Sequence, residues 1–159
     1  MTKMHRQSGA TTLEFAIVGA TALLVLFSMI EFGRAVFVLN TLSETTRRAA
    51  RVATVCPIND PAIIEVALFN PAGGGTDSRI VGGLTPGNIA IEYIGNDGAV
   101  ITDPVANFSQ IRFVRARVVN FQHQMLIPFA DFIFTTPDFV TTLRRESLGV
   151  PRDGAIVPC

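Results

Sequence analysis

An apolar segment without charge lies near the start of the chain. Phe15 to Ile30 contains no charged residue, and counting back through Ala10 to Leu13 gives the ~20 residues that a helix needs to cross a bilayer. The one charged residue in this stretch is Glu14. A secretory signal would end in a small-residue cleavage site, but the chain continues as EFGRAVFVLN without a convincing one. We therefore expect the segment to be retained as an anchor in the lipid bilayer.

The helical pattern continues beyond Glu31. Apolar residues recur there at spacings of three and four, or their sums, and most arginines fall between them. These apolar positions are Phe32, Val36, Leu39, Leu42, Ala49, Val52 and Ala53. Pro57 cannot comfortably continue a helix, so Cys56 marks the end. The pattern predicts one helix over residues 10–55, of which about residues 10–30 are embedded in the membrane.

Turn-forming residues divide the next part of the chain. Asn59-Asp60-Pro61 is typical of a helix start, and a short apolar face follows before Asn70-Pro71. This predicts a short second helix. The glycine-rich stretch from 71 to 88 is predicted to be a loop, and it lacks the lysine and hydroxyl residue of a phosphate-binding loop.

From residue 89 onward the pattern changes to strands. IAIEYI (89–94) and AVIT (99–102) flank Asn96-Asp97-Gly98, which predicts a hairpin. IRFVRARVVNF (111–121) predicts a strand with Val114, Ala116 and Val118 on one face, and residues 139–144 predict the last strand. The apolar stretch 125–135 is interrupted by Pro128 and Asp131, so it is too broken to be a second membrane helix.

These elements predict an α+β fold in which a long N-terminal helix packs on a small, mainly antiparallel sheet. At 159 residues the chain suits one small domain plus an anchor, and it is too short for two ordinary domains. The expected organisation is a leader over 1–9, the helix over 10–55 and an extracytoplasmic α+β domain over 56–159.

Composition and charge narrow the classes of function. The chain is 48% hydrophobic and only 16% charged, with the apolar excess near the N-terminus. Acidic and basic residues are balanced at 13 each and interspersed, so we expect no nucleic-acid partner. Removal of Lys3 and Arg6 with a leader would change this balance to 11 basic against 13 acidic residues.

Few residues suggest chemistry in the C-terminal part. Cys56 and Cys159 permit one intramolecular pairing, which is favoured outside the cytoplasm; two unpaired cysteines are the alternative. His123 has no neighbouring histidine or cysteine, so we expect a partly buried or surface histidine, no metal and no cofactor. No catalytic motif is present, which argues against an enzyme.

The charged side chains after residue 89 fit a solvated surface. Arg115 and Arg117 alternate with apolar residues, as on any half-exposed strand, so with Arg112 they predict a solvated face or salt bridges between subunits rather than a site for polyanions. The acids Glu92, Asp131 and Asp138 are expected to be solvated or to lie in turns.

The residues around the start of the apolar segment form a specific constellation. Met1 to Gly9 is short, polar and basic, and a cut after Gly9 would make Ala10 the first residue and Glu14 the fifth. A carboxylate at the edge of hydrocarbon is costly unless it has a partner, and the new amine of a neighbouring chain could supply one. That is the pattern of type IV prepilins, with Glu14 setting the register between subunits. Taken alone, Glu14 could also simply cap the membrane helix.

The N-terminal third resembles the TadE-like family. Three stretches support the resemblance: LEF at 13–15, EFGRA at 31–35 and TRRAARVA at 46–53, with Phe15 where type IV pilins often have tyrosine. The resemblance implies a pseudopilin or minor pilin of the Tad adhesive pilus. Its implied partners are a prepilin peptidase, other Tad pilins and pseudopilins, and the pilus assembly platform of the inner membrane.

Two alternatives to a prepilin remain. A membrane-anchored extracytoplasmic binding domain that never polymerises would use the same helix as a tether, with an uncleaved N-terminus. An anchored enzyme ranks lower. The expected topology has a cytoplasmic N-terminus and an extracytoplasmic C-terminal domain, but basic residues flank both sides of the helix, so charge does not decide it.

Overall fold

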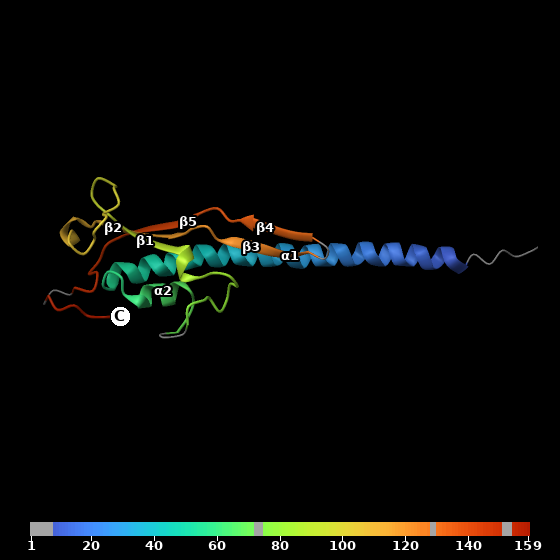
Figure 1. Cartoon of the computed structure of the whole chain (residues 1–159), viewed down its shortest axis with the longest axis horizontal. Coiled ribbons are helices and arrows are strands. Elements are labelled where there is room, and N and C mark those ends of the chain that lie inside the picture. Colours follow the sequence, from blue (N-terminus) through green and yellow to red (C-terminus); the bar gives the residue numbers. More distant parts are fainter. Residues whose placement is uncertain (1–7, 72–74, 128–129, 151–153) are drawn as a thin grey trace, which may run out of the picture.

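A single long helix, α1 (Ser8–Val55), organises the molecule. The computed structural model describes residues 8–71, 75–127, 130–150 and 154–159. A small α+β unit packs on the C-terminal half of α1, whereas the N-terminal half extends away from it (Figure 1). The predicted fold class is therefore confirmed. Of the expected leader, residues 1–7 lie outside the described part, and Ser8 and Gly9 belong to the first turn of α1.

The main sheet has three antiparallel strands in the order β1-β2-β5. They are β1 (Ile89–Ile94), β2 (Phe113–Val118) and β5 (Phe139–Arg144). Side chains alternate along β2, so that Val114, Ala116 and Val118 are all buried, as their period of two predicts. This face of the sheet packs on α1, and the last predicted strand, 139–144, is confirmed.

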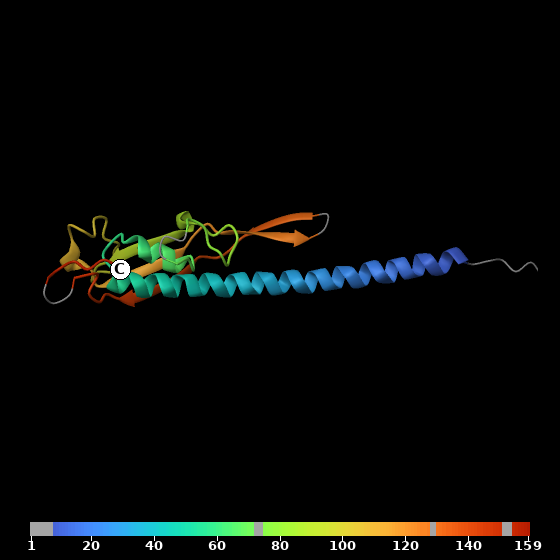
Figure 2. The same ribbon diagram turned by 90° about the horizontal axis from the view of Figure 1, so that it is seen from below.

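A second sheet consists of β3 (Gln122–Ile127) and β4 (Ala130–Thr135) alone. Val118 pairs with Phe139, and Gln122 pairs with Thr135 in the same register. Strands β2 and β3 therefore form one long hairpin with β4 and β5, interrupted at 119–121 and 136–138. At the interruption the Thr136 N–H donates to the Phe121 carbonyl at 3.0 Å. The β3-β4 half projects beyond the core on the side of the N-terminal half of α1 (Figure 2).

The buried face of α1 differs from the predicted one. Leu42, Ala49 and Ala53 are fully buried, but Phe32 and Val36 are exposed. The sheet covers a stripe that also contains threonines. The Thr41 hydroxyl donates to the Phe37 carbonyl and the Thr46 hydroxyl to that of Ser43, whereas the buried Thr45 hydroxyl has no hydrogen-bond partner among the described residues. Hydrophobic periodicity alone could not find this stripe, because polar residues belong to it and apolar residues occupy other faces as well. The three arginines at 47, 48 and 51 are exposed or solvent-facing as expected.

The second helix forms as predicted, over α2 (Pro61–Ala67). The carboxylate of Asp60 caps it by accepting from the Ala62 N–H at 2.9 Å, and proline occupies its first turn. In the part of 71–88 that the structure describes, the chain is irregular up to the 3-10 turn η1 (Pro86–Asn88).

The predicted strand at 99–102 does not form. Its only ladder contact is a single bridge between Ile94 and Val100. The turn itself closes, because Gly95 donates to the Ala99 carbonyl, but the Asp103 carboxylate then accepts from Ala106 and bends the chain into the 3-10 turn η2 (Phe108–Gln110). Strand β1 pairs along its other edge with β2.

Arg115 and Arg117 lie on the half-exposed face of β2, as expected, and their salt bridges form within the chain rather than between subunits. Arg115 contacts Glu92 at 2.6 Å, and Arg117 contacts Glu92 at 3.2 Å and Asp138 at 2.7 Å. The hydrogen bonds to Asp138 and then to Glu92 raise the pKa of Arg117. Glu92 and Asp138 are therefore ion-pair partners rather than free surface acids.

Candidate functional site

The residues of the expected processing site lie in the first two turns of α1 and are exposed. Nothing lies within 4 Å of a Cβ placed on Gly9, so folding of the described residues does not require glycine there. Ala10 and Glu14 are four residues apart in the helix and therefore share a face. Phe15 is 79% exposed, and the Glu14 carboxylate has no hydrogen bond or ion pair to a described residue. This end of the helix is free to meet another molecule.

The apolar segment that follows is exposed along almost its whole length. The structure has one helix among its described residues that is long and apolar enough to cross a membrane, and it is α1. Two hydroxyls interrupt its apolar surface, but both are satisfied inside the helix: Thr21 donates to the Ile17 carbonyl and Ser28 to that of Leu24, each at 2.8 Å. Internal satisfaction of polar groups is what a lipid environment demands.

A buried polar contact marks the point where α1 enters the folded domain. Glu31 is buried there, and one of its oxygens accepts a 2.6 Å hydrogen bond from Arg34 one turn later. Its other oxygen lies 3.7 Å from Nε2 of His123, which is buried on β3. The ring of His123 packs edge-on against Phe134 of β4, with centroids 5.3 Å apart. This contact attaches the β3-β4 hairpin to α1.

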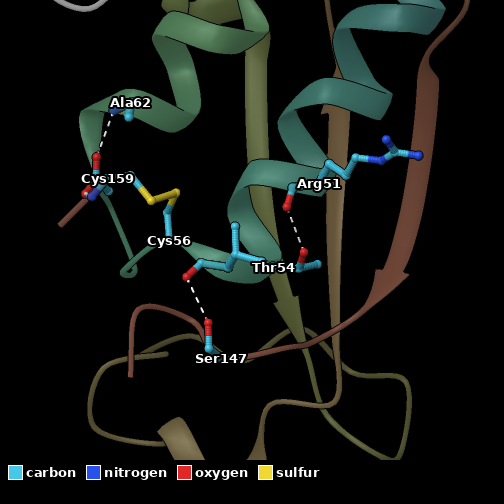
Figure 3. Close-up of a disulfide and its surroundings, with 8 residues drawn as sticks. Arg51, Thr54, Cys56, Ala62, Ser147 and Cys159 are labelled. Carbon is cyan, nitrogen blue, oxygen red and sulfur yellow. Dashed lines mark hydrogen bonds between the residues drawn. A yellow bond between two sulfur atoms is a disulfide. The ribbon is translucent and has the colours of Figure 1, made fainter. Parts of the chain in front are cut away.

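The C-terminal end of α1 is closed by the tail of the chain. The Leu148 N–H donates to the Thr54 carbonyl, and the Gly149 N–H donates to the Val55 carbonyl. The Ser147 hydroxyl also donates to the Val55 carbonyl (Figure 3). These bonds satisfy carbonyls that every helix end leaves without intrahelical partners. The tail thereby caps the C-terminal end of α1.

A disulfide joins this helix end to the last residue of the chain. The Sγ atoms of Cys56 and Cys159 are bonded across 103 residues (Figure 3), so the predicted pairing is confirmed. The Cys159 N–H also donates to the Asp60 carboxylate, the group that caps α2. The bridge and the cap together bind the tail to the α1–α2 corner.

The N-terminal helix is also the part of the chain that is similar to a known protein family. Residues 9–51 match the family model of TadE-like proteins. The matched stretch begins at the exposed glycine and ends inside the buried half of α1, so the expected TadE-like resemblance is confirmed for this part of the chain. The search of curated proteins found no match. The search of solved structures found none either.

The structure brings together some residues that sequence analysis left apart. Cys56 meets Cys159 as expected, whereas Gly9, Ala10, Glu14 and Phe15 stay together only through their helix. The pairing of Glu31 with His123 was missed, because residues 92 positions apart offer no local pattern. Across 8–71, 75–127, 130–150 and 154–159, no three His, Cys, Asp or Glu side chains gather as a metal site would require.

Proposed function

We propose that this chain is a minor pilin or pseudopilin of a Tad-type adhesive pilus, anchored in the inner membrane by α1. A prepilin peptidase hydrolyses the Gly9–Ala10 bond, and the mature chain assembles through its N-terminal helix with other Tad pilins and pseudopilins. The observation that best supports this is the apolar half of α1, which is exposed from Gly9 to Ile30 while the domain packs only on the half that follows. The match of residues 9–51 to TadE-like proteins supports the same assignment.

The proposed role of Glu14 follows from its surroundings. Its carboxylate lies at the start of the apolar surface and has no partner among the described residues. In a filament it would pair with the Ala10 amine of a neighbouring subunit, where low dielectric makes a lone charge costly. Phe15 lies beside it and would bury its ring against the same neighbour. This pairing would set the axial register.

The disulfide supports the proposed topology. Structural disulfides persist in oxidising compartments and are rare in the cytoplasm. A bond between Cys56 and Cys159 therefore favours an extracytoplasmic domain, and the N-terminus then lies on the cytoplasmic side of a single-pass helix. The disulfide therefore supports this proposed orientation, for which the flanking charges gave no preference.

The N-terminus of the chain recovered from membranes tests the proposal. We expect intact-mass and terminal-peptide spectrometry to find a start at Ala10 in cells that contain the whole assembly system. The variant Gly9→Val should keep the start at Met1 and remain folded, since the space around Gly9 is open. Gly19→Val, at another open position of α1, is the matched control and should be cut normally. A start at Met1 in the unmodified chain would favour the non-polymerising tethered domain.

A further inference from the structure

The β3-β4 hairpin reaches along α1 past the level of Glu31. His123, near the start of β3, lies against Glu31, and the strands continue from there on the side of the N-terminal half of the helix (Figures 1 and 2). At ~3.3 Å per strand residue, Leu126 lies about 10 Å beyond His123. That length equals about seven helical residues, which puts Leu126 level with about Leu24. Leu24 belongs to the uncharged segment of α1.

The polarity of the hairpin changes along its length. Near the core, Gln122 pairs with Thr135, and His123 is buried next to Phe134. Farther out the exposed side chains are large and apolar: Leu126 at 67%, Ile133 at 60% and Phe132 at 56%. Phe132 and Ile133 are sequence neighbours on a strand, so they point to opposite faces. From the Gln124–Ile133 pair outward, both faces of the hairpin therefore carry exposed apolar side chains, and on one of these faces Leu126 is paired with Asp131.

The exposed apolar side chains of this hairpin need a partner that shields them from water. A two-stranded sheet is marginal in water, and no third strand pairs with β3 or β4 among the described residues. Full insertion into hydrocarbon is also excluded, because the outer edges of both strands would keep unpaired backbone groups there and β4 contains Asp131. The boundary between lipid headgroups and acyl chains satisfies both demands, since it solvates polar groups and accepts apolar side chains.

We propose that the β3-β4 hairpin, from the Gln124–Ile133 pair outward, is a second membrane contact, which inserts Leu126, Phe132 and Ile133 at the headgroup–acyl boundary beside α1. The proposal rests on the membrane anchoring of α1 proposed above. Lipid is favoured over a second copy because the hairpin continues the exposed apolar surface of α1 at the same level. Leu126, at about 10 Å past Glu31, reaches the ~5–10 Å to which interfacial elements insert, and Ile133, opposite Gln124, lies shallower at about 3 Å.

A second membrane contact would fix the orientation of the folded domain relative to the membrane. One helix leaves a domain free to rotate about the membrane normal and to tilt, whereas a second contact fixes the face that the domain presents. The Glu31–His123 contact holds this second contact to the first. A chain that leaves the bilayer to enter a filament must then withdraw the hairpin as well as the helix.

Single-tryptophan depth measurements test the proposal, because the chain has no tryptophan of its own. The full chain is reconstituted at low density in vesicles of phosphatidylcholine and phosphatidylglycerol, with bromines near the headgroup end of the acyl chains as quenchers. Leu126→Trp and Ile133→Trp should each be quenched at least about twofold, as expected of interfacial side chains. Val140→Trp, on the exposed face of β5, should be unaffected.

Leu24→Trp separates failure of this inference from failure of the proposed anchoring. If Leu24→Trp is quenched and both hairpin variants are not, the hairpin does not touch lipid and the inference is wrong. If none of the three is quenched, the anchoring of α1 is wrong as well. A third outcome is that bromine does not quench the hairpin tryptophans, yet they are shielded from an aqueous quencher. If that shielding is lost when the protein is diluted, the hairpin contacts a second copy of the chain and the inference is wrong. Because both substituted positions are exposed, folding of either variant suffices for the test.

Discussion

Glu31 Oε1 lies 3.7 Å from Nε2 of His123, and this contact joins α1 to β3 where the exposed helix meets the domain. Both side chains are buried, and neither of these two atoms has a hydrogen-bond partner among the described residues. Arg34 binds only the other carboxylate oxygen. At 3.7 Å the two atoms are too far apart for a hydrogen bond, so the contact between Glu31 and His123 is electrostatic.

We expect Glu31→Leu and His123→Leu each to lower the free energy of unfolding by about 1–3 kcal/mol, because each removes the polar group that faces the other buried polar side chain. The double variant should lose less than the sum of the two. Urea unfolding of the full chain in detergent, followed by circular dichroism, measures this. Glu44→Gln is the control, since its pair with Arg48 is 46% exposed on both sides and should contribute less than about 1 kcal/mol. Strict additivity would show that the contact contributes nothing.

Gly149 lies in the tail that closes the end of α1, and we expect Gly149→Ala to destabilise the fold. Its φ of 75° disfavours a side chain, and an added Cβ would overlap the ring of Pro57. The loss should exceed about 1 kcal/mol, since alanine is incompatible with this backbone. Gly154→Ala separates the two causes, because Gly154 has a similar φ of 79° but open space around it. Equal losses of thermal stability in the two variants would exclude the Pro57 overlap as a cause.

Reduction of the disulfide should destabilise the chain strongly. The bridge closes a loop across 103 residues, and the chain-entropy model assigns such a loop about 4–5 kcal/mol. Cys56→Ser, Cys159→Ser and the double variant should therefore have the same denaturation midpoint, equal to that of the reduced unmodified chain. Urea unfolding with and without reductant measures the shift. A midpoint that does not respond to reductant would mean that the bridge stabilises nothing.

Replacement of Glu14 separates assembly from processing. We expect Glu14→Gln to be cut after Gly9 yet to enter sheared pili at least about tenfold less, because breaking a charge pair in low dielectric costs about 3–5 kcal/mol. Quantitative immunoblotting of the pilus and membrane fractions measures both steps. Glu44→Gln changes the same charge on the exposed side of the same helix and should assemble normally. Normal incorporation of Glu14→Gln would contradict the register role and favour a simple tether.

Local features of the chain could be predicted from the sequence because their causes are local. The length of α1 follows from an uninterrupted pattern that Pro57 ends, and α2 from the Asp60 cap and its proline. The buried face of β2 follows from its period of two, and the bridge between Cys56 and Cys159 from the absence of any other cysteine. The helices and the buried strand face depend on residues that are close in sequence, and the two cysteines allow only one intramolecular disulfide.

Long-range packing decided what the pattern could not. The strand expected at 99–102 is reduced to the Ile94–Val100 bridge on the edge of β1 that β2 leaves open, because the turn at Asp103 bends the chain away. The face of α1 that is buried depends on where the sheet lies, so Phe32 remained exposed and Thr41 became covered. Glu31 and His123 meet because one long hairpin folds back along the helix, and periodicity encodes no such distance between segments. The sequence alone determined α1, α2 and the strands β1, β2 and β5, whose patterns are local, whereas tertiary contacts determined the β3-β4 hairpin and which surfaces of these elements meet.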